Sequence, residues 1–504
     1  MIKLIKPSIL GLFLCVSVIG RSQKAKDFYT ETNTLGITKD FVADYGGTPD
    51  DGIDDSADLQ AAIEDMKKQP NGGIIKIPAG DYLLSGIVMK SNVHLEIDYN
   101  VKIYPTPRTD TKNYSIFAFG GDFGTVINTS IRGVGGKFIV DLRNLQNKNV
   151  AVFNFKNVKN FHLSKFNVLD DNTKFSAVTF GYSEHNGNYF VPRHGVILNG
   201  KISNAHYGYG LVQMQAGKNI LLKYLKGTGG VTLRLETGYD KMNLLQVGGV
   251  DQIYGRTIAC TNGNAAVMIS PHAIQNGHVD VSDITGISCG FAVRIGGGYT
   301  KPDQEAAGLI PGTFKSTSVV SDIHATYGTN AQLKSKHFKY MPCNLVDDIA
   351  SDFNIDGESY KAPSVAAVID GSKGTGPGYF NINIEEADVT AVGFASQPKL
   401  ILHDEDADQC SNSASKNAKK STNEVQDPIE GVYPNPATDL LNVVLSEDVV
   451  GNNLLLLNSL GAVVFQKNVD VNSDKTISVD VSSFTSGVYY LTLGNGQTQK
   501  IIIQ

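Results

Sequence analysis

The residues between about 150 and 300 repeat loosely, with a period of roughly 20 to 35 residues. Each unit holds two or three short runs of alternating apolar and polar residues, separated by glycine or asparagine. The units are KNFHLSKFNV…SAVTF, GVILNGKISN…GLVQM, KNILLKYLKG…GVTLRLE, DQIYGRTIAC…AAVMIS and GHVDVSDITG…FAVRIG. Repeats built only of strand and turn predict a parallel β-helix, because each coil must bury its apolar face on the next. A β-propeller would need a more regular blade of four antiparallel strands.

The closing strands of the last four units, GLVQMQ, GVTLRLE, AAVMISPH and FAVRIGG, predict where their side chains point, because side chains alternate along a strand. Eight apolar residues are expected to point inward: Val212, Met214, Leu233, Leu235, Val267, Ile269, Val293 and Ile295. Seven residues are expected to point outward: Gln213, Gln215, Arg234, Glu236, Ser270, His272 and Arg294. Neighbouring coils lie about 4.8 Å apart, so the outward residues should form one patch about 15 Å long.

This outward patch carries groups suited to catalysis on an anionic ligand. A glutamate beside apolar strand edges can have a raised pKa and act as a general acid, which is the role we predict for Glu236. Arg234 and Arg294 have the planar fork that binds sulfate or carboxylate. Between Gly200 and Thr300, eight Lys or Arg residues face five Asp or Glu residues, which favours an anionic ligand. Tryptophan is absent, so the 21 tyrosines would have to supply any sugar-stacking surface.

The same patch has a simpler interpretation. An Arg-x-Glu pair on a strand usually forms cross-strand ion pairs, and a histidine after proline is usually a turn or surface residue. The convergence of Arg234, Glu236 and His272 on one face of the predicted sheet favours a functional site.

Residues 1–22, MIKLIKPSILGLFLCVSVIGRS, are predicted to be a secretory signal peptide. Two lysines precede an apolar run that is too short to span a membrane, and small residues follow it. No later segment is long and apolar enough for a membrane span, so we expect an exported protein. The net charge of −6 argues against a nucleic-acid partner, and 41% hydrophobic residues are enough for a packed core.

A helix and a cluster of aspartates are expected before the repeats. Ser56 or Asp55 can cap a helix in which the apolar residues of LQAAIEDM share one face. The strands IIKIP, VHLEID and VKIYP follow, an order that resembles the start of the pectate-lyase-like right-handed β-helices. The four aspartates between residues 50 and 55 could bind calcium, but turn and cap hydrogen bonds are the simpler interpretation.

The C-terminal part of the chain has a different composition. Residues 411–428 are mostly polar and are predicted to be a linker, and residues 429–504 form a separate domain of short strands. This domain begins with YPNPATDLLNV and ends with GVYYLTL…KIIIQ, which resemble the sorting domain of proteins exported by the type IX secretion system of Bacteroidetes. The resemblance implies a small β-sandwich and delivery to the medium or the outer cell surface. A generic β-sandwich binding module is the alternative.

Four cysteines remain after the signal peptide. Cys343 and Cys410 lie in polar surroundings and could form a disulfide in an oxidising compartment. Cys260 and Cys289 are flanked by apolar residues and are expected to be small core residues. None of the four has the spacing of metal ligands.

Four motifs resemble the iota-carrageenase family of glycoside hydrolases: YGYGLVQMQA, GGVTLRLETG, ISPHAIQNGHVDV and FAVRIGGG, beginning at residues 207, 229, 269 and 291. The resemblance covers most of residues 35–410, within a predicted catalytic domain of residues 23–410. It implies an all-β protein, a right-handed parallel β-helix that hydrolyses β-1,4 linkages of iota-carrageenan, a sulfated red-algal galactan, with inversion. It implies that no organic cofactor is needed. It also implies a bound structural calcium or sodium ion and a bound chloride ion.

The resemblance assigns roles to individual residues. Glu236 matches the general acid of the family. Gln213 and His272 match polar residues of its active site, and Arg234 and Arg294 match arginines that contact sulfate.

One position departs from the family pattern. The family has an aspartate, the proposed base, two residues after the acid, and this chain has Gly238 there. Inversion needs a second carboxylate about 6.5–9.5 Å from the acid, which leaves room for the water. Asp240 has the right parity if the strand continues, and Asp303 and Glu305 are the alternatives. The last two begin a non-repeating segment of about residues 299–352, an insertion expected to cover the groove as a lid or small subdomain.

Together these features predict an endo-acting, monomeric hydrolase of iota-carrageenan that is secreted or attached to the outer cell surface. Glu236 would protonate the leaving oxygen, Asp240 or Glu305 would activate the water, and Gln215 would contact the sulfated polysaccharide. The type IX secretion machinery is the other expected partner. Two alternatives stay open, a lyase of uronate polymers such as pectin or alginate, and a non-catalytic β-helix adhesin.

Overall fold

The computed structural model describes residues 23–397, 399–407, 429–433, 435–445, 452–458, 462–469, 476–493 and 499–504. The chain divides into two compact units, Met1–Ser411 and Asn412–Gln504. The predicted signal peptide, the predicted linker and Cys410 lie outside the described residues. Within the described part of the chain, no helix is long and apolar enough to cross a membrane.

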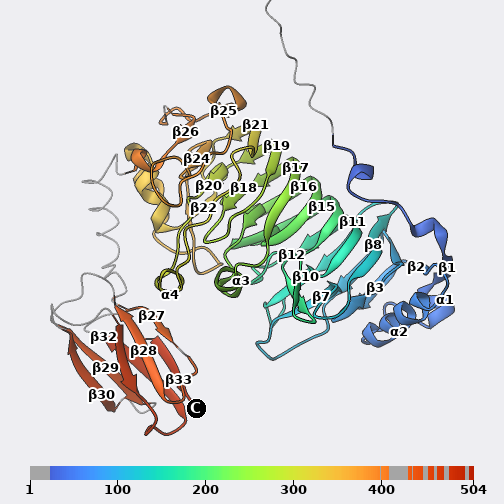
Figure 1. The fold of residues 1–504 in the computed structure, drawn as a ribbon, viewed down its shortest axis with the longest axis horizontal. Helices are drawn as coiled ribbons and strands as arrows, with labels where there is room; N and C mark the ends of the chain where they lie inside the picture. The colour runs from blue at the N-terminus through green and yellow to red at the C-terminus, as the bar shows by residue number, and fades with distance from the viewer. Residues whose placement is uncertain are drawn as a thin grey trace, which may run out of the picture. The chain divides into compact units, whose positions relative to one another are not determined.

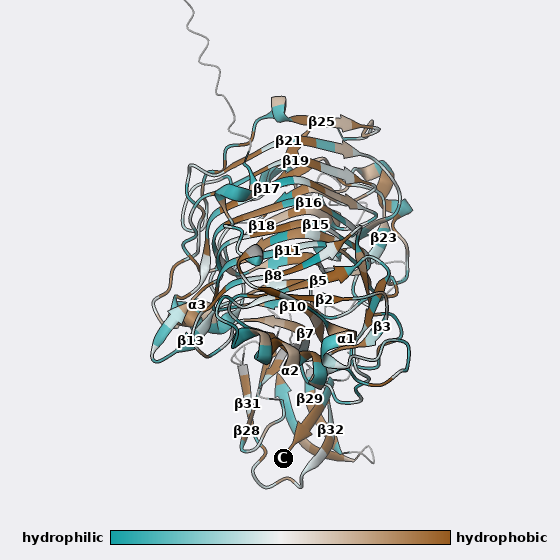
Figure 2. Ribbon diagram, turned by 90° about the vertical axis from the view of Figure 1, so that its right-hand side faces the viewer, coloured by the Kyte–Doolittle hydropathy of each residue, from teal (hydrophilic) through white to brown (hydrophobic). Residues whose placement is uncertain are grey.

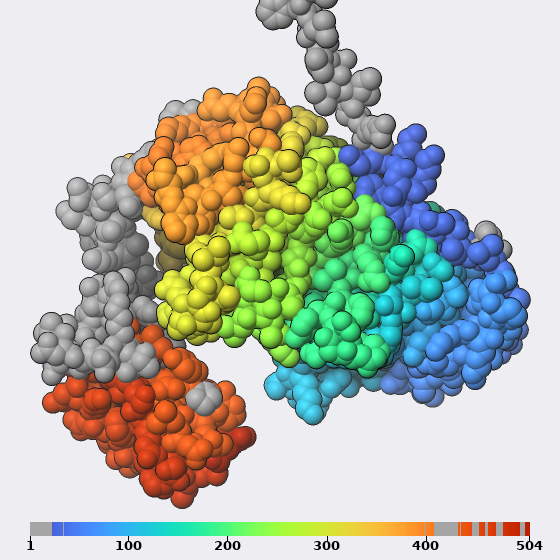
Figure 3. All heavy atoms as spheres, viewed as in Figure 1, coloured from blue at the N-terminus to red at the C-terminus, as the bar shows by residue number. Residues whose placement is uncertain are grey.

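One sheet of 22 strands winds through the first unit as a right-handed parallel β-helix (Figure 1). Successive coils lie against one another, so the colour in Figure 3 changes steadily from one end of this unit to the other. The strands are β1 Ile37–Asp40, β2 Gly73–Ile77, β3 Gly80–Leu83, β4 Ile87–Met89, β5 Val93–Asp98, β6 Val101–Tyr104, β7 Tyr114–Phe119, β8 Val126–Val134, β9 Phe138–Asp141, β10 Val150–Phe155, β11 Val158–Leu169, β12 Val178–Phe180, β15 Arg193–Met214, β16 Ala216–Glu236, β17 Gly249–Thr261, β18 Ala265–Ser270, β19 Val279–Ile287, β20 Phe291–Ile295, β21 Val319–Thr326, β24 Val368–Asp370, β25 Val389–Val392 and β26 Ile401–Leu402.

The strands pair in parallel and stack in three ladders. The first ladder runs through β1, β2, β5, β8, β11, β15, β16, β17, β19, β21 and β25, and Figure 2 shows most of it stacked. The second joins β3, β6 and β9 to the later half of β11. The third runs through β4, β7, β10 and β12 to the ends of β15 and β16, and then through β18, β20, β24 and β26. The predicted patch lies on the third ladder.

The inward side chains of the third ladder form the core, as predicted. All eight are at most 2% exposed: Val212, Met214, Leu233, Leu235, Val267, Ile269, Val293 and Ile295. In the earlier coils, Phe119, Phe155 and Phe180 stack with ring centroids 4.2 and 4.7 Å apart. Identical residues at one level in successive coils fix the coil register, because a slip would break the stack.

A ladder of asparagines turns the chain at one corner of the coils. Asn92, Asn128 and Asn160 have positive φ values of 61°, 57° and 58°. Asparagine tolerates this left-handed backbone better than most residues with a Cβ. The side chain of Asn128 donates to Oδ1 of Asn92 at 3.0 Å and accepts from Asn160 at 2.8 Å. Each turn is therefore tied to the turns above and below it.

The helices α1, Phe41–Tyr45, and α2, Ser56–Lys67, lie next to the first coil. Asp55 occupies the N-cap position, but its carboxylate bonds to the backbone of the preceding loop. Asp54 accepts a hydrogen bond from the backbone N–H of Ser56 at 2.9 Å. The aspartates thus make turn hydrogen bonds, and the described residues hold no group of three His, Cys, Asp or Glu suited to a metal ion. The apolar face of α2 is buried as predicted: Leu59, Ile63 and Met66.

The prediction of one insertion over residues 299–352 is wrong. β21 lies inside that segment and pairs with β19 and β25, so it is a strand of the coil. The coil was hard to recognise because its next strand, β24, follows only after a long excursion. The chain leaves the coils twice. The first excursion, between β20 and β21, contains α4 Pro302–Ala306. The second excursion, between β21 and β24, contains β22 Ala331–Leu333, η3 Ser335–Tyr340, η4 Cys343–Asp348 and β23 Tyr360–Ala362. β22 and β23 pair in antiparallel orientation, and the residues around them pack on the outer face of the third ladder.

The cysteines agree with the prediction where the structure describes them. Cys260 and Cys289 are buried free thiols, and Cys343 is in a disulfide. The remaining short elements of the first unit are η1 Ala25–Asp27, η2 Asn33–Leu35, β13 Ser183–His185, β14 Asn188–Phe190, α3 Asp240–Leu245, η5 Glu386–Asp388 and η6 Asp404–Asp406.

The second unit contains two antiparallel sheets. The first sheet is β27 Ile429–Tyr433, β28 Leu440–Leu445 and β31 Thr476–Asp480, and the second is β30 Val463–Val469, β29 Asn452–Asn458, β32 Gly487–Leu493 and β33 Gln499–Ile503. Val443 and Val479 of the first sheet share a core with Leu456 and Leu491 of the second. The unit is a small β-sandwich, as predicted.

Candidate active site

The third ladder places the predicted outward residues in adjacent rows. Pairing of β15, β16, β18 and β20 sets Gln213, Arg234, Met268 and Arg294 side by side. Glu236 stands in the next row, two residues further along β16. The register is the one predicted from the alternation, and Met268, between the two arginines, is the member that the sequence analysis missed.

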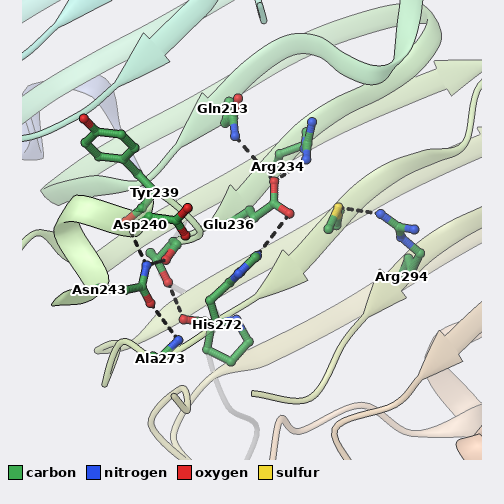
Figure 4. Close-up of polar contacts among 12 residues, drawn as sticks. Gln213, Arg234, Glu236, Tyr239, Asp240, Asn243, His272, Ala273 and Arg294 are labelled. Carbon is green, nitrogen blue, oxygen red and sulfur yellow. Dashed lines mark hydrogen bonds and ion pairs between the residues drawn. The ribbon is translucent and has the colours of Figure 1, made fainter. Parts of the chain in front are cut away.

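Glu236 ends β16, and three side chains surround its carboxylate (Figure 4). Nη2 of Arg234 and Nε2 of Gln213 contact Oε2, the second at 3.4 Å. Nε2 of His272 lies 3.4 Å from Oε1. The residue is only 9% exposed. Gln213, Glu236 and His272 belong to three successive coils, so coil stacking holds the carboxylate in place.

The charge state of Glu236 differs from the prediction. Burial raises the pKa of this carboxyl, as expected. The charge of Arg234, the hydrogen bond and charge of His272, and the charge of Arg294 outweigh burial and lower the pKa to about 2. Without a bound ligand the carboxyl is therefore ionised, and the prediction of a raised pKa is wrong for this state.

A turn after β18 aims His272 at Glu236. His272 follows Pro271 and has a φ of 48°. Its carbonyl oxygen accepts hydrogen bonds from the backbone N–H groups of Tyr299, at 3.0 Å, and Gly312, at 2.6 Å. Its ring packs against that of Tyr299 with centroids 4.7 Å apart. The first excursion therefore fixes the imidazole.

The ring of His272 fills the space beside Gly238. A Cβ at position 238 would lie 2.5 Å from Nε2 and 2.6 Å from Cε1 of that ring. Side-chain atoms do not approach this closely, so an aspartate would fit at this position only if the imidazole moved. The glycine and the position of the histidine depend on each other.

Asn243 determines the path of the chain after β16. Its Nδ2 donates to the carbonyl oxygens of Thr237 and Tyr239, both at 2.9 Å, and its Oδ1 accepts from the N–H of Ala273 at 2.8 Å (Figure 4). The hydroxyl of Thr237 donates to the carbonyl of Pro271 at 2.7 Å. One buried amide thus joins the end of β16 to the turn that carries His272. The local sequence pattern does not predict this role of Asn243.

The predicted continuation of β16 is wrong, because the strand ends at Glu236. Asp240 instead begins α3, its side chain is 56% exposed, and it pairs with Lys301 at 2.8 Å. Glu305 lies on α4 and accepts a hydrogen bond from the hydroxyl of Thr300 at 2.8 Å. The parity argument for Asp240 as the base therefore fails, although the residue lies only two positions beyond Gly238.

A groove of about 840 Å³ opens beside Glu236 and extends over the preceding coils. Four tyrosines line it and offer the aromatic surface that the sequence analysis expected in place of tryptophan: Tyr114, Tyr182, Tyr209 and Tyr239. Its polar lining includes the amides of Asn154, Gln213 and Gln215, the ammonium groups of Lys156 and Lys241, the imidazole of His272, and the carboxylates of Asp122, Glu184 and Glu236. A groove of this composition suits a carbohydrate chain.

Arg294 lies outside the lining of this groove. Its guanidinium contacts Nε2 of His337 at 2.8 Å, the hydroxyl of Tyr207 at 3.4 Å and the sulfur of Met268 at 2.7 Å. Burial and the charge of Arg294 lower the pKa of His337, so its ring is neutral and accepts the hydrogen bond. Lys336 belongs to the same region, because its pKa is lowered first by burial and then by Arg294. Crowded positive charges of this kind favour an anionic ligand.

Two family models match the chain. Residues 431–504 match the secretion system C-terminal sorting domain, and residues 41–269 match the rhamnogalacturonase A/epimerase, pectate lyase-like family. The first match agrees with the predicted type IX sorting domain. The protein is secreted or held at the cell surface.

The first unit resembles known iota-carrageenases in sequence. The iota-carrageenase of Zobellia galactanivorans is 37% identical over 424 residues, which are 72% of this chain and 85% of that protein. The iota-carrageenase of Alteromonas macleodii is 33% identical over 412 residues, 70% of this chain and 84% of that protein.

Solved structures agree. An iota-carrageenase complexed to iota-carrageenan fragments has a TM-score of 0.70 at 31% identity and covers 76% of this chain and 94% of its own. An iota-carrageenase of family GH82 from A. fortis, solved in the absence of chloride ions, has a TM-score of 0.70 at 33% identity, with 77% and 94% covered. Fold and site together define a β-helical glycoside hydrolase. The chain belongs to the iota-carrageenase family, GH82. Bound calcium, sodium or chloride stays a prediction.

Proposed function

We propose that this enzyme cuts the β-1,4 linkages of iota-carrageenan within the polymer and inverts the configuration at the cut. The observation that carries the proposal is Glu236, a buried carboxylate held by an arginine, an amide and an imidazole beside a tyrosine-lined groove. A sulfated substrate agrees with the positive charges of Arg234, Arg294 and Lys336. It also agrees with the relatives, which are iota-carrageenases.

In this proposal each residue of the patch has a defined role. Glu236 donates a proton to the glycosidic oxygen as the carbon–oxygen bond breaks. Gln213 and His272 orient the carboxyl group. Arg234 and Arg294 pair with sulfate groups of the polymer, as arginine forks do with tetrahedral anions.

The base is the second carboxylate that inversion requires. We propose Asp240, which directly follows the groove residue Tyr239 and whose side chain is fixed by Lys301. Glu305 on α4 is the second candidate. During the reaction a water attacks the anomeric carbon and transfers its proton to this carboxylate.

One experiment tests the function. The mature chain is incubated with iota-carrageenan, other sulfated galactans, pectin and alginate, and the fragments are analysed by size and by proton NMR of the newly formed reducing ends. The proposal predicts a rapid fall in chain length for iota-carrageenan, saturated fragments, and a new end with the α configuration. Unsaturated fragments from pectin or alginate would identify a lyase instead, and the absence of shortening for every polymer would identify an adhesin. The monomeric state stays a prediction.

A further inference from the structure

The proposed acid is paired with a cation in the ligand-free enzyme. Arg234 and Glu236 are in direct contact, and their side chains are only 12% and 11% exposed. A carboxylate paired with a guanidinium has no proton to give. Glu236 must therefore lose this partner and gain a proton before it can act as the acid of the proposed function.

Arg234 keeps hydrogen-bond donors that are available to another anion. A guanidinium has five N–H donors. Within the described part of the chain its hydrogen-bond partner is Glu236, and its Nε is buried without one. The ring of Tyr209, which lines the groove, lies 5.9 Å from its Cζ. The guanidinium thus lies next to two residues of the groove lining, Glu236 and Tyr209.

We propose that Arg234 is a specificity switch, which holds Glu236 as an inactive carboxylate in the free enzyme and releases it when a sulfate group of the bound polymer takes over the guanidinium. A sulfate can accept two parallel hydrogen bonds from the fork. A galactan without sulfate at this place offers no replacement, so it leaves Glu236 ionised. The inference rests on the proposed function and adds a reason why the enzyme would require sulfate.

The remaining surroundings of Glu236 determine what happens after release. The other titratable or charged groups that face it are His272, Arg294, Lys336, Tyr209 and Tyr299. Burial raises the pKa of this carboxyl, and the charge of Arg234 is the strongest influence that lowers it. In this proposal the negative sulfate compensates that charge, and burial, which is the largest single influence on this pKa, then favours uptake of a proton from solvent.

Each catalytic cycle takes up one proton from solvent and returns one proton to it. One proton enters from solvent on binding and passes from Glu236 to the glycosidic oxygen as the bond to the anomeric carbon breaks. The attacking water delivers its hydroxyl to that carbon and its proton to the base, which returns the proton to solvent. When the sulfated product leaves, Glu236 is again a carboxylate beside Arg234.

Calorimetry of binding in two buffers with different ionisation enthalpies tests the switch. The probes are the short oligosaccharides that remain after exhaustive digestion of iota-carrageenan, and the same oligosaccharides after chemical desulfation. At pH 7 the full chain should take up about one proton per sulfated oligosaccharide bound and none with the desulfated form. The Glu236→Gln variant should bind the sulfated probe without proton uptake.

Kinetics supply a second readout that a purely structural role would not move. The Arg234→Gln variant should lower the ratio of kcat/KM for sulfated over desulfated polymer by about tenfold or more, because Glu236 no longer needs sulfate for its release. The matched control is Arg132→Gln, which breaks the ion pair between Arg132 on β8 and Glu31 and should leave the ratio unchanged.

The possible failures are distinct. Cleavage of iota-carrageenan with no proton uptake, or an equal loss by Arg234→Gln on both polymers, would overturn the switch and leave the proposed function standing. A wild-type enzyme that cleaves no sulfated galactan would overturn the proposed function itself.

Discussion

Glu236 illustrates how an arginine on the same strand face changes the state of a buried carboxyl. Burial alone predicts a raised pKa for this carboxyl. Arg234 lies two residues earlier, so alternation puts both side chains on the same face of the strand. The same parity that put the two residues into one patch also brings their charged groups into contact. Residues i and i+2 of opposite charge on a strand should be treated as one unit when a pKa is predicted.

Gly238 and His272 are coupled by space. Because a Cβ at position 238 would lie 2.5 Å from Nε2 of His272, Gly238→Ala should displace the imidazole and lower kcat/KM by about tenfold or more. In a His272→Ala background, the same glycine substitution should cause little further loss, because the obstructing ring is gone. Steady-state kinetics of the two single variants and the double variant measure this coupling.

Losses that simply multiply in the double variant would contradict the steric account. The His272→Ala variant is its own control, since it removes the contact with Glu236 without adding a side chain at position 238.

At the scale of elements, the end of β16 marks the limit of the strand pattern. The alternation predicted the strand and its inward and outward faces correctly up to Glu236. Beyond it, the buried amide of Asn243 binds the carbonyl groups of Thr237 and Tyr239 and turns the chain into α3. Those hydrogen bonds join residues that are adjacent only in the folded protein, so periodicity could not reveal them. Asp240 was misplaced for this reason.

The asparagine ladder predicts a measurable contribution to stability. Asn128→Ala removes both side-chain hydrogen bonds of the middle rung and puts a residue that disfavours positive φ at 57°. The free energy of unfolding should fall by about 2 kcal/mol. Asn128→Gly keeps the backbone conformation and loses only the ladder bonds, so its loss should be about 1 kcal/mol.

Denaturant unfolding of the wild type and both variants checks this prediction. Equal losses for the alanine and glycine variants would show that the left-handed turn contributes nothing beyond the hydrogen bonds.

At the scale of the whole molecule, most of the architecture followed from the sequence. The repeating units predicted the parallel β-helix, and their closing strands predicted the buried ladder from Val212 to Ile295 and the outward row beside it. The coil containing β21 was missed, because its third-ladder strand is separated from it by the second excursion. Repeats reveal coils only where the strands of one coil follow one another closely.

The site was predictable in part for the same reason. Gln213, Arg234 and Glu236 belong to regular strands, and stacking brought them together as expected. Met268 was not predicted as a member of the outward row, because methionine in a strand is usually a core residue. His337 contacts Arg294 from the second excursion. This segment has no sequence repeat, so its fold and this contact could not be predicted from the periodicity.

The central claim is that Glu236 supplies the proton for cleavage of a sulfated galactan. The most direct test measures reducing ends released from iota-carrageenan by the wild type and by Glu236→Gln, with binding of the polymer measured in parallel. The glutamine keeps the size of the side chain and its amide can still face Gln213 and His272, but it has no transferable proton. The account predicts that reducing-end release falls by at least about three orders of magnitude while binding persists. Release by the variant at a rate near that of the wild type would contradict it.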